Sequence, residues 1–540
     1  MSDSTDGDAI PAPEGPANLI ETDYEIGQNN VQLLGLDIHN PVFAVSGLSV
    51  VAFVIITMAF QNTIGPVFTG MRDFLTSTFD WFFLLAGNIF VLVCLGLIIS
   101  PLGKVRIGGR DATPDYGYAG WFAMLFAAGM GIGLMFYGVS EPISHYSTSF
   151  GGVTLENGVR TDWAPLGGAE GDAAASHALG MAATIFHWGL HPWAIYAIVA
   201  LSLALFAYNK GLPLTVRSIF YPIFGERIWG WPGHIIDILA VFATLFGLAT
   251  SLGVGAQQAN AGLNYLFGLP IGTTSQIVLI ALITGVALIS VLRGLDGGVK
   301  LLSEVNLVMA GVLVVFILLA GPTLTLFGDL VDNVGAYAAE LIPLSNPFGR
   351  EDANFSQGWT AFYWAWWISW SPFVGMFIAR VSRGRTVREF ITCVLLIPTA
   401  VSIVWMTVLG GAALDQLIVE GFTGAQDAAL ELKLFEMLTQ MPLTFIASLL
   451  SIVLVIVFFV TSSDSGSLVI DTITAGGKVD APVAQRVFWA TFEGLVAAAL
   501  LIGGGLGALQ AMAVSTGFPF AIVLLLACYA LIKGLMDEPR

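Results

Sequence analysis

The chain has 540 residues, of which 56% are hydrophobic and only 11% are charged. Soluble domains carry about 25% charged residues, so this composition excludes a soluble globular protein and predicts an all-α, multi-pass membrane protein whose first partner is the lipid bilayer. The net charge of −18 at pH 7 argues against nucleic acid as a partner.

Residues 1–40 hold eight acidic residues and no lysine or arginine. Few apolar residues accompany them, which predicts an acidic and disordered cytoplasmic tail. A secretory signal peptide needs a basic segment near its start, and this segment has none.

Twelve apolar segments follow the tail, and each is long enough to cross a bilayer as a helix. With the tail in the cytoplasm, all but four of the 20 lysines and arginines fall in cytoplasmic loops or in the short C-terminus, 533–540. This distribution predicts a plasma-membrane protein with both termini in the cytoplasm. The predicted spans are 41–60, 80–100, 117–140, 178–208, 233–258, 273–292, 303–327, 357–379, 389–414, 441–462, 483–502 and 508–532.

The third span carries Gly129, Gly131 and Gly133 at every second position, with Met130 between the first two. Glycines this close weaken a helix and let its backbone open, although close packing of helices through small residues is the alternative. If the helix is broken here, the backbone amides at these positions can bind a carboxylate, because the positive end of a half-helix favours anions.

The eighth span contains a tryptophan-rich face, and Ser371–Pro372 predicts a break within it. Such a face offers aromatic π-surfaces to a cation that has no proton to donate. An interfacial aromatic belt is the alternative, but belts lie at helix ends and this cluster lies inside the span. At helical spacing the shared face comprises Trp359, Tyr363, Trp366, Trp367 and Trp370.

The fourth span places Trp188 and Tyr196 two helical turns apart, where they can face inward and complete a cage. His187 and His191 have the i, i+4 spacing of a metal-binding pair. No carboxylate or cysteine companion is evident, so packing or gating is favoured for them. Glu141, beside Pro142, is interpreted as structural.

The segment Phe362–Arg385, FYWAWWISWSPFVGMFIARVSRGR, resembles the signature of the betaine/choline/carnitine transporter family. The resemblance implies a leucine-transporter-like core of two inverted five-span repeats, formed by spans 3–7 and 8–12 and preceded by two extra helices. The domains expected are two peripheral helices over 41–116, a first repeat over 117–356 and a second over 357–532. It also implies a homotrimer with a surface helix near 331–344 at its contacts.

The same resemblance implies which residues bind substrate and ion. The trimethylammonium group of the substrate would be surrounded by Trp188, Tyr196, Trp366, Trp367 and Trp370. A sodium ion would be held by Phe458, Thr461 and Ser462 together with the carbonyls of Ala127 and Met130.

A second sodium site is implied at Thr244 and Phe373, but Leu248 replaces the threonine that completes it in the family. Leucine offers no oxygen, so we expect the second site to be weak or absent. The alternative is that water or a backbone carbonyl fills the gap. At the first site, the hydroxyls that end the tenth span can instead bond to carbonyls of their own helix.

These observations predict a secondary transporter that takes up a compatible solute with a quaternary ammonium group, glycine betaine first, by sodium symport and without another cofactor. The resemblance also favours a net-neutral zwitterion as substrate, because choline carriers of the family typically have an aspartate at the position of Gly133. The alternatives are a proton-driven choline or carnitine carrier and an ectoine or proline carrier. A channel is disfavoured by the paired broken helices. An enzyme is disfavoured because no Ser/His/Asp set, metal cluster or nucleotide loop stands out.

Overall fold

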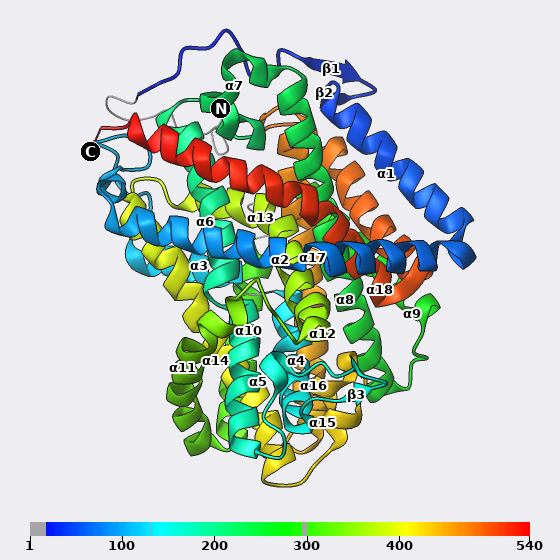
Figure 1. The fold of residues 1–540 in the computed structure, drawn as a ribbon. Helices are drawn as coiled ribbons and strands as arrows, with labels where there is room; N and C mark the ends of the chain where they lie inside the picture. The colour runs from blue at the N-terminus through cyan, green and yellow to red at the C-terminus, as the bar shows by residue number, and fades with distance from the viewer. Residues whose placement is uncertain (1–17, 130, 294–299, 540) are drawn as a thin grey trace.

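The computed structural model describes residues 18–129, 131–293 and 300–539, and within them the fold is a bundle of long helices with two short β-hairpins (Figure 1). The hairpins pair β1 (Asn30–Leu33) with β2 (Leu36–His39) and β3 (Leu155–Glu156) with β4 (Val159–Arg160). The helices of the bundle are α1 (Val42–Ala59), α2 (Gln61–Ile99), α3 (Tyr118–Gly129), α4 (Ile132–Gly151), α5 (Ala173–Trp188), α6 (Leu190–Ala204), α8 (Trp231–Phe267), α9 (Thr273–Arg293), α10 (Lys300–Ala320), α11 (Thr323–Ser345), α13 (Ala361–Val381), α14 (Val387–Ile418), α17 (Thr444–Thr474) and α18 (Val483–Met536). Short helices connect them: α7 (Tyr221–Phe224), α12 (Ala353–Phe355), α15 (Gly424–Asp427) and α16 (Lys433–Thr439).

Nine helical segments in the described residues are long and apolar enough to cross a membrane. Three more crossings complete the predicted twelve. The first is α3 with α4, which share one interrupted crossing, and the second is α13. The third is the second half of α18, which follows the non-helical Gly504 and Gly505. The protein is therefore an all-α, multi-pass membrane protein.

Equivalent members of the two predicted five-span groups pack against each other. α8 packs against α17, α9 against α18, α5 and α6 against α14, and α3 against α13. A two-fold axis in the membrane plane produces this kind of pairing in transporters built from inverted repeats. The core between these helices holds several fully buried aromatic side chains, among them Trp121, Trp364, Trp366 and Trp489.

The prediction that the whole N-terminal tail is disordered is wrong for residues 18–40. This segment forms the β1–β2 hairpin and packs on the helix ends. Tyr24 stacks on Trp229 with ring centroids 4.3 Å apart, and Asp37 pairs with Lys478 at 2.5 Å. Acidic composition alone does not reveal these long-range partners. Residues 1–17 lie outside the described part.

Ser371–Pro372 does not break the eighth span, contrary to the sequence prediction. α13 runs as one helix from Ala361 to Val381 with Pro372 inside it. Proline removes the N–H that would bond to the carbonyl of Ile368. The hydroxyl of Ser371 donates to that carbonyl at 2.6 Å, so the freed group stays paired within the helix.

The surface helix is longer than the predicted 331–344, because α10 ends at Ala320 and α11 starts at Thr323 and continues to Ser345. One face of α11 packs on α5 and α14, where the Asn333 amide donates to the Thr407 hydroxyl at 3.0 Å. Its other face exposes Leu324 and Ile342, which are 88% and 79% accessible. The role of this helix in a trimer stays a prediction.

Candidate functional site

The glycine-rich segment of the third span is broken, as the sequence predicts. α3 ends at Gly129 and α4 begins at Ile132, with Gly131 between them in an extended conformation (φ −170°, ψ −178°). No side chain caps the start of α4, so the N–H groups of its first turn remain available to a ligand. Met130 lies outside the described residues.

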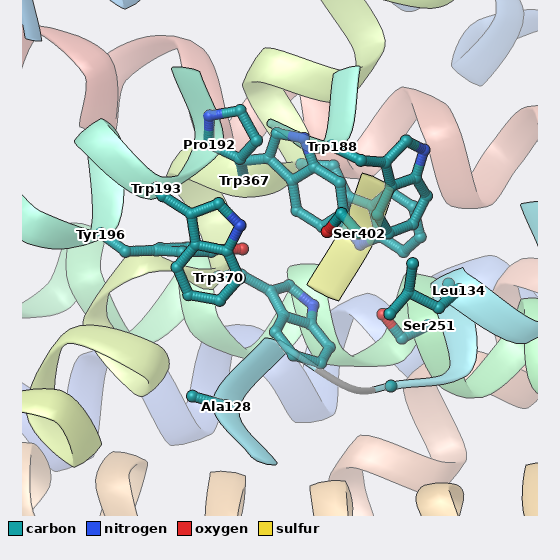
Figure 2. Close-up of a pocket in the computed structure, with 13 residues that line it drawn as sticks. Ala128, Leu134, Trp188, Pro192, Trp193, Tyr196, Ser251, Trp367, Trp370 and Ser402 are labelled. Atoms are coloured by element: carbon teal, nitrogen blue, oxygen red, sulfur yellow. The ribbon is translucent and has the colours of Figure 1, made fainter. Parts of the chain in front are cut away.

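A small cavity of about 40 Å³ lies beside this break and is walled by aromatic side chains (Figure 2). Gly131, Gly133 and Leu134 line it from the start of α4, and Ser251 and Ser402 line it from α8 and α14. At ~10–15 Å³ for each water molecule, it holds about three waters, so a larger solute enters only if the walls separate. The aromatic walls are Trp188, Trp193, Tyr196, Trp366, Trp367 and Trp370.

Trp367 is the central member of this aromatic cage. It stacks on Trp366 at 5.0 Å between ring centroids and 10° between planes. Trp188 meets it edge-on at 4.9 Å and Tyr196 at 6.3 Å, and Tyr196 in turn contacts Trp193 at 5.2 Å. These rings line one cavity, and a cage of aromatic rings whose faces meet the cation is how proteins bind quaternary ammonium groups.

The structure thus brings together all five aromatic residues predicted from the sequence, and it adds Trp193. Sequence reasoning missed Trp193 because it treated the fourth span as one continuous helix. The span is interrupted at Gly189, between α5 and α6, and the register changes there. Trp359, by contrast, contacts His145 and Tyr137, away from the cavity lining.

Four of the five tryptophans of the cage are held by a hydrogen bond from the indole N–H. Trp370 and Trp366 both donate to the carbonyl of Gly247 on α8, at 2.9 and 3.3 Å. Trp367 donates at 2.9 Å to the carbonyl of His187, which lies in the last turn of α5, where carbonyls have no intrahelical partner. The ring orientations are therefore fixed before a ligand arrives.

The fourth indole, that of Trp188, donates to Glu141 Oε2 at 2.8 Å. Tyr363 donates its hydroxyl to the same oxygen at 2.5 Å, and His187 and His145 contact Glu141 Oε1 at 2.6 and 3.0 Å. Four groups thus converge on one fully buried carboxylate. The sequence interpretation of Glu141 as a structural residue missed this, although an acidic residue within an apolar span is itself a signal of function.

His187 and His191, whose i, i+4 spacing is that of a metal-binding pair, have different partners in the structure. His191 contacts Asn88 Oδ1 at 2.9 Å and stacks on Trp364, whereas His187 joins Glu141 and His145. The facing atoms of Glu141, His145 and His187 lie within 4.8 Å of one another. Hydrogen bonds between the imidazoles and the carboxylate account for this arrangement.

The residues of the first predicted sodium site lie on two helices. Phe458, Thr461 and Ser462 are in the middle of α17 and not at a helix end, because α17 continues to Thr474. The Thr461 hydroxyl donates within its own helix, to the carbonyls of Val457 and Phe458, and accepts from Asn306 at 3.3 Å.

On the other side of this site, Ala127 lies in the last turn of α3, where carbonyls have no intrahelical partner. Among the described hydrogen bonds, none joins Thr461 to α3. The sodium assignment stays a prediction.

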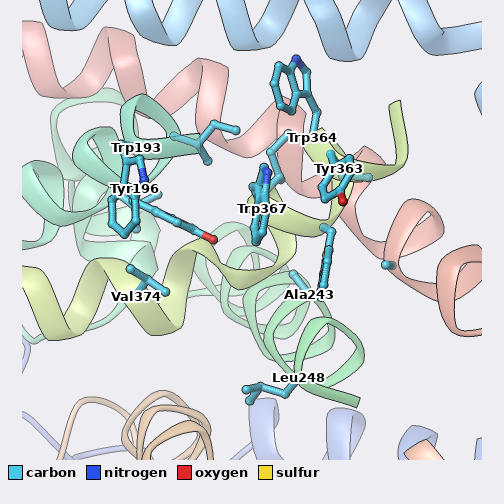
Figure 3. Close-up of a cluster of buried hydrophobic side chains, with 14 of the residues drawn as sticks. Trp193, Tyr196, Ala243, Leu248, Tyr363, Trp364, Trp367 and Val374 are labelled. Atoms are coloured by element: carbon cyan, nitrogen blue, oxygen red, sulfur yellow. The ribbon is translucent and has the colours of Figure 1, made fainter. Parts of the chain in front are cut away.

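At the second predicted sodium site, Leu248 offers no oxygen and belongs to the buried hydrophobic cluster of Figure 3. It packs against α17, so close to Gly466 that a Cβ added there would lie 2.2 Å from Leu248 Cδ1. The Thr244 hydroxyl donates to the carbonyl of Ala240 at 2.8 Å, and Phe373 contacts Trp370 edge-on. The weakness or absence of the second sodium site stays a prediction.

A broken helix beside a small cavity in the centre of a multi-pass bundle is the architecture of a secondary transporter. Residues 41–540 match the family described as BCCT, betaine/carnitine/choline family transporter, and the chain belongs to this family.

Its relatives are transporters too. A glycine betaine/proline/choline transporter of Vibrio parahaemolyticus is 65% identical over 99% of this chain and 98% of its own. A glycine betaine transporter of the same organism is 55% identical over 96% and 98%, and one of Bacillus subtilis is 43% identical over 92% and 94%. Among solved structures, a manganese transporter of Eremococcus coleocola aligns over 79% of this chain and 82% of its own with 12% identity and a TM-score of 0.39, a likeness too weak to describe this fold.

Proposed function

We propose that this transporter takes up glycine betaine by sodium symport across the plasma membrane, with both termini in the cytoplasm. The observation that carries the proposal is the aromatic cage beside the broken third span. The cage suits a quaternary ammonium group, and the uncapped start of α4 suits the carboxylate of the same molecule. The names of the relatives above, all of which include glycine betaine, support this substrate.

The test is uptake of radiolabelled glycine betaine into proteoliposomes that contain the purified protein, with and without an inward sodium gradient. We expect accumulation above equilibrium only with the gradient. Competition with unlabelled choline, proline and ectoine ranks the solutes. Uptake that only equilibrates the solute across the membrane would contradict symport. Accumulation driven by a proton gradient alone would show that the coupling ion is the proton and not sodium.

Gly133 is expected to control the preference between zwitterions and cations. A Cβ at this position would lie 2.8 Å from Trp188 Cη2 and 3.2 Å from Trp366 Cη2, so any side chain enters the cage. We expect Gly133→Asp to lower betaine uptake and to raise choline uptake relative to betaine at least tenfold, because a carboxylate attracts a net cation. Competition assays measure the ratio. Gly133→Ala is the control for size, and an equal change of the ratio in both variants would argue against an effect of charge.

The number of sodium ions is expected to depend on Leu248. We expect a Hill coefficient for sodium near 1 in the unmodified protein, as one bound ion gives. Leu248→Thr places a hydroxyl one helical turn from Thr244 and should raise the sodium-to-betaine ratio measured by reversal potential. Leu248→Val has the shape of threonine without its oxygen and should leave the ratio unchanged. A ratio of two in the unmodified protein would show that Leu248 does not matter.

The first sodium site is tested by Thr461→Ala, which removes one oxygen ligand of a hard cation. We expect this variant to bind betaine but to lose its dependence on sodium. Its matched control is Thr444→Ala near the start of the same helix, where the hydroxyl bonds to Met441. Normal sodium dependence in Thr461→Ala would remove this residue from the site.

A further inference from the structure

The helices α17 and α18 carry ionisable residues at seven-residue spacing in a region away from the cage. α17 contributes Asp464 and Asp471, and α18, which runs back along it, contributes Arg486 and Glu493. Arg486 Nη2 pairs with Asp464 Oδ1 at 2.8 Å, near the end of the bundle that holds the β1–β2 hairpin. Residues seven apart lie about two helical turns apart on one face, so Glu493 is deeper in the bundle than Arg486.

Glu493 has an incomplete set of partners. Its Oε2 accepts from the Ser463 hydroxyl at 2.9 Å, while its Oε1 makes no hydrogen bond within the described chain. The Thr284 hydroxyl of α9 is also buried and unpartnered, and it lies against Gly494, where an added Cβ would be 2.5 Å from it. Two buried oxygens at the contact of α9, α17 and α18 thus lack the partners that native interiors normally supply.

The charges around Glu493 do not neutralise it. Asp464 is the nearest ionisable group, and both of its oxygens are committed, one to Arg486 and the other to Ser290 at 2.6 Å. Asp471 lies a further two turns towards the hairpin, near the same arginine. Among the described residues along this contact of α17 with α18, Arg486 is therefore the one cation beside the three carboxyl groups of Asp464, Asp471 and Glu493.

In the described residues of α9, α1, α8 and α2, which pack against α18, no compensating charge faces Glu493. On α9, Arg293 is an exposed residue in the last turn. α1 carries no ionisable residue, and His234 and Asp237 of α8 are bound to Arg217. On the part of α2 that meets the far half of α18, Arg72 is paired with Asp73.

An ionised carboxylate without a cation inside a membrane is unfavourable. A bound cation removes this penalty, and the geometry selects which cation. A metal ion needs several oxygen ligands, but the oxygens of Asp464 are already used, and only Glu493 Oε1 and the Thr284 hydroxyl are unpartnered at this contact. A proton needs only Glu493 Oε1.

We propose that Glu493 is a proton-binding site that gains and loses its proton during transport. The carboxyl group transfers its proton to a water molecule, which becomes a hydroxonium ion, and a carboxylate remains. That carboxylate and the carboxylate of Asp464 then repel each other, which weakens the contact of α17 with α18. Ser463, the hydrogen-bond partner of Glu493, directly follows Ser462, so the proton binds beside the proposed sodium site. A coupling of this proton to sodium-driven uptake rests on the proposed function, whereas the proton site itself does not.

The first experiment is infrared difference spectroscopy of the purified full chain in lipid, titrated between acidic and alkaline pH without solute. We expect a protonated-carboxyl band in the unmodified protein that disappears at alkaline pH and is absent from Glu493→Gln. Glu420→Gln, at an exposed position, is the matched control and should keep the band. If Glu493→Gln cannot be purified, Ser463→Ala decides, because loss of the hydroxyl partner should shift the band. A band that Glu493→Gln retains, or that Ser463→Ala leaves in place, would overturn the proposal.

The second experiment is betaine uptake at constant sodium gradient and membrane potential over the same pH range. Uptake by the unmodified protein should fall at least tenfold as pH rises, whereas Glu493→Gln, which is always neutral, should stay near the low-pH rate. Identical profiles would overturn the coupling. A third outcome is that sodium stabilises the unmodified protein but not Glu493→Gln, and that the unmodified protein shows no titrating carboxyl band. This outcome would identify Glu493 as part of a sodium site and would overturn the proton site. Since the infrared titration uses no solute, it remains decisive even if betaine is not the substrate.

Discussion

Replacing Trp367 with alanine is expected to raise the half-saturating betaine concentration about thirtyfold. Trp367 contacts Trp366, Trp188 and Tyr196, so its removal opens the centre of the cage. A desolvated contact between a cation and an aromatic face contributes about 2 kcal/mol, which corresponds to that factor in affinity. Uptake kinetics in proteoliposomes, corrected for the amount of inserted protein, measure the change.

Two further variants separate binding from stability. Trp367→Phe keeps an aromatic face and should lose less affinity than Trp367→Ala. Trp364→Ala removes an equally buried tryptophan from the same helix, but one that stacks on His191 and points away from Tyr196 (Figure 3). It should lower stability by roughly 3–5 kcal/mol and leave the half-saturating concentration of the remaining protein unchanged. Equal loss of affinity in both alanine variants would show that packing, not the cage, sets affinity.

Hydropathy and residue type were enough to predict the crossings and the cage. The predicted apolar runs fall on helices of the bundle, and nine helical segments in the described residues are long and apolar enough to cross a membrane. The break between α3 and α4 followed from glycine, whose backbone opens readily. The five predicted aromatic residues converge because spacing on a helix fixes which side chains share a face.

The sequence did not predict features that depend on partners distant in the chain. Proline predicts a break at Pro372, but the Ser371 hydroxyl repairs the lost hydrogen bond and α13 continues. Acidic composition predicts a disordered tail, but Asp37 forms an ion pair with Lys478, which is more than 400 residues away in the chain. The convergence on Glu141 joins α4, α5 and α13, and no local pattern shows which donors will surround that carboxylate.

Glu141→Gln is expected to weaken betaine uptake about tenfold or more, although Glu141 does not line the cavity. A carboxylate accepts from all four of its neighbours, whereas a glutamine turns an N–H₂ group towards two of these donors. Two buried donors then lose their acceptor, and each unsatisfied group is unfavourable by about 1–3 kcal/mol. Since one of the four is the indole of Trp188, the wall of the cage loses its fixed orientation.

A double-mutant cycle distinguishes this positioning role from a general loss of stability. Trp188→Phe keeps the aromatic face and removes the N–H, so by itself it should mimic part of the effect of Glu141→Gln. If Glu141 acts through Trp188, the double variant should be little worse than Glu141→Gln alone, with a coupling energy of about 0.5–3 kcal/mol. Tyr363→Phe, which removes a donor to the same oxygen but leaves the Trp188 bond, is the matched control and should change affinity less. Additive effects of Glu141→Gln and Trp188→Phe on the half-saturating concentration would place the role of Glu141 outside the cage.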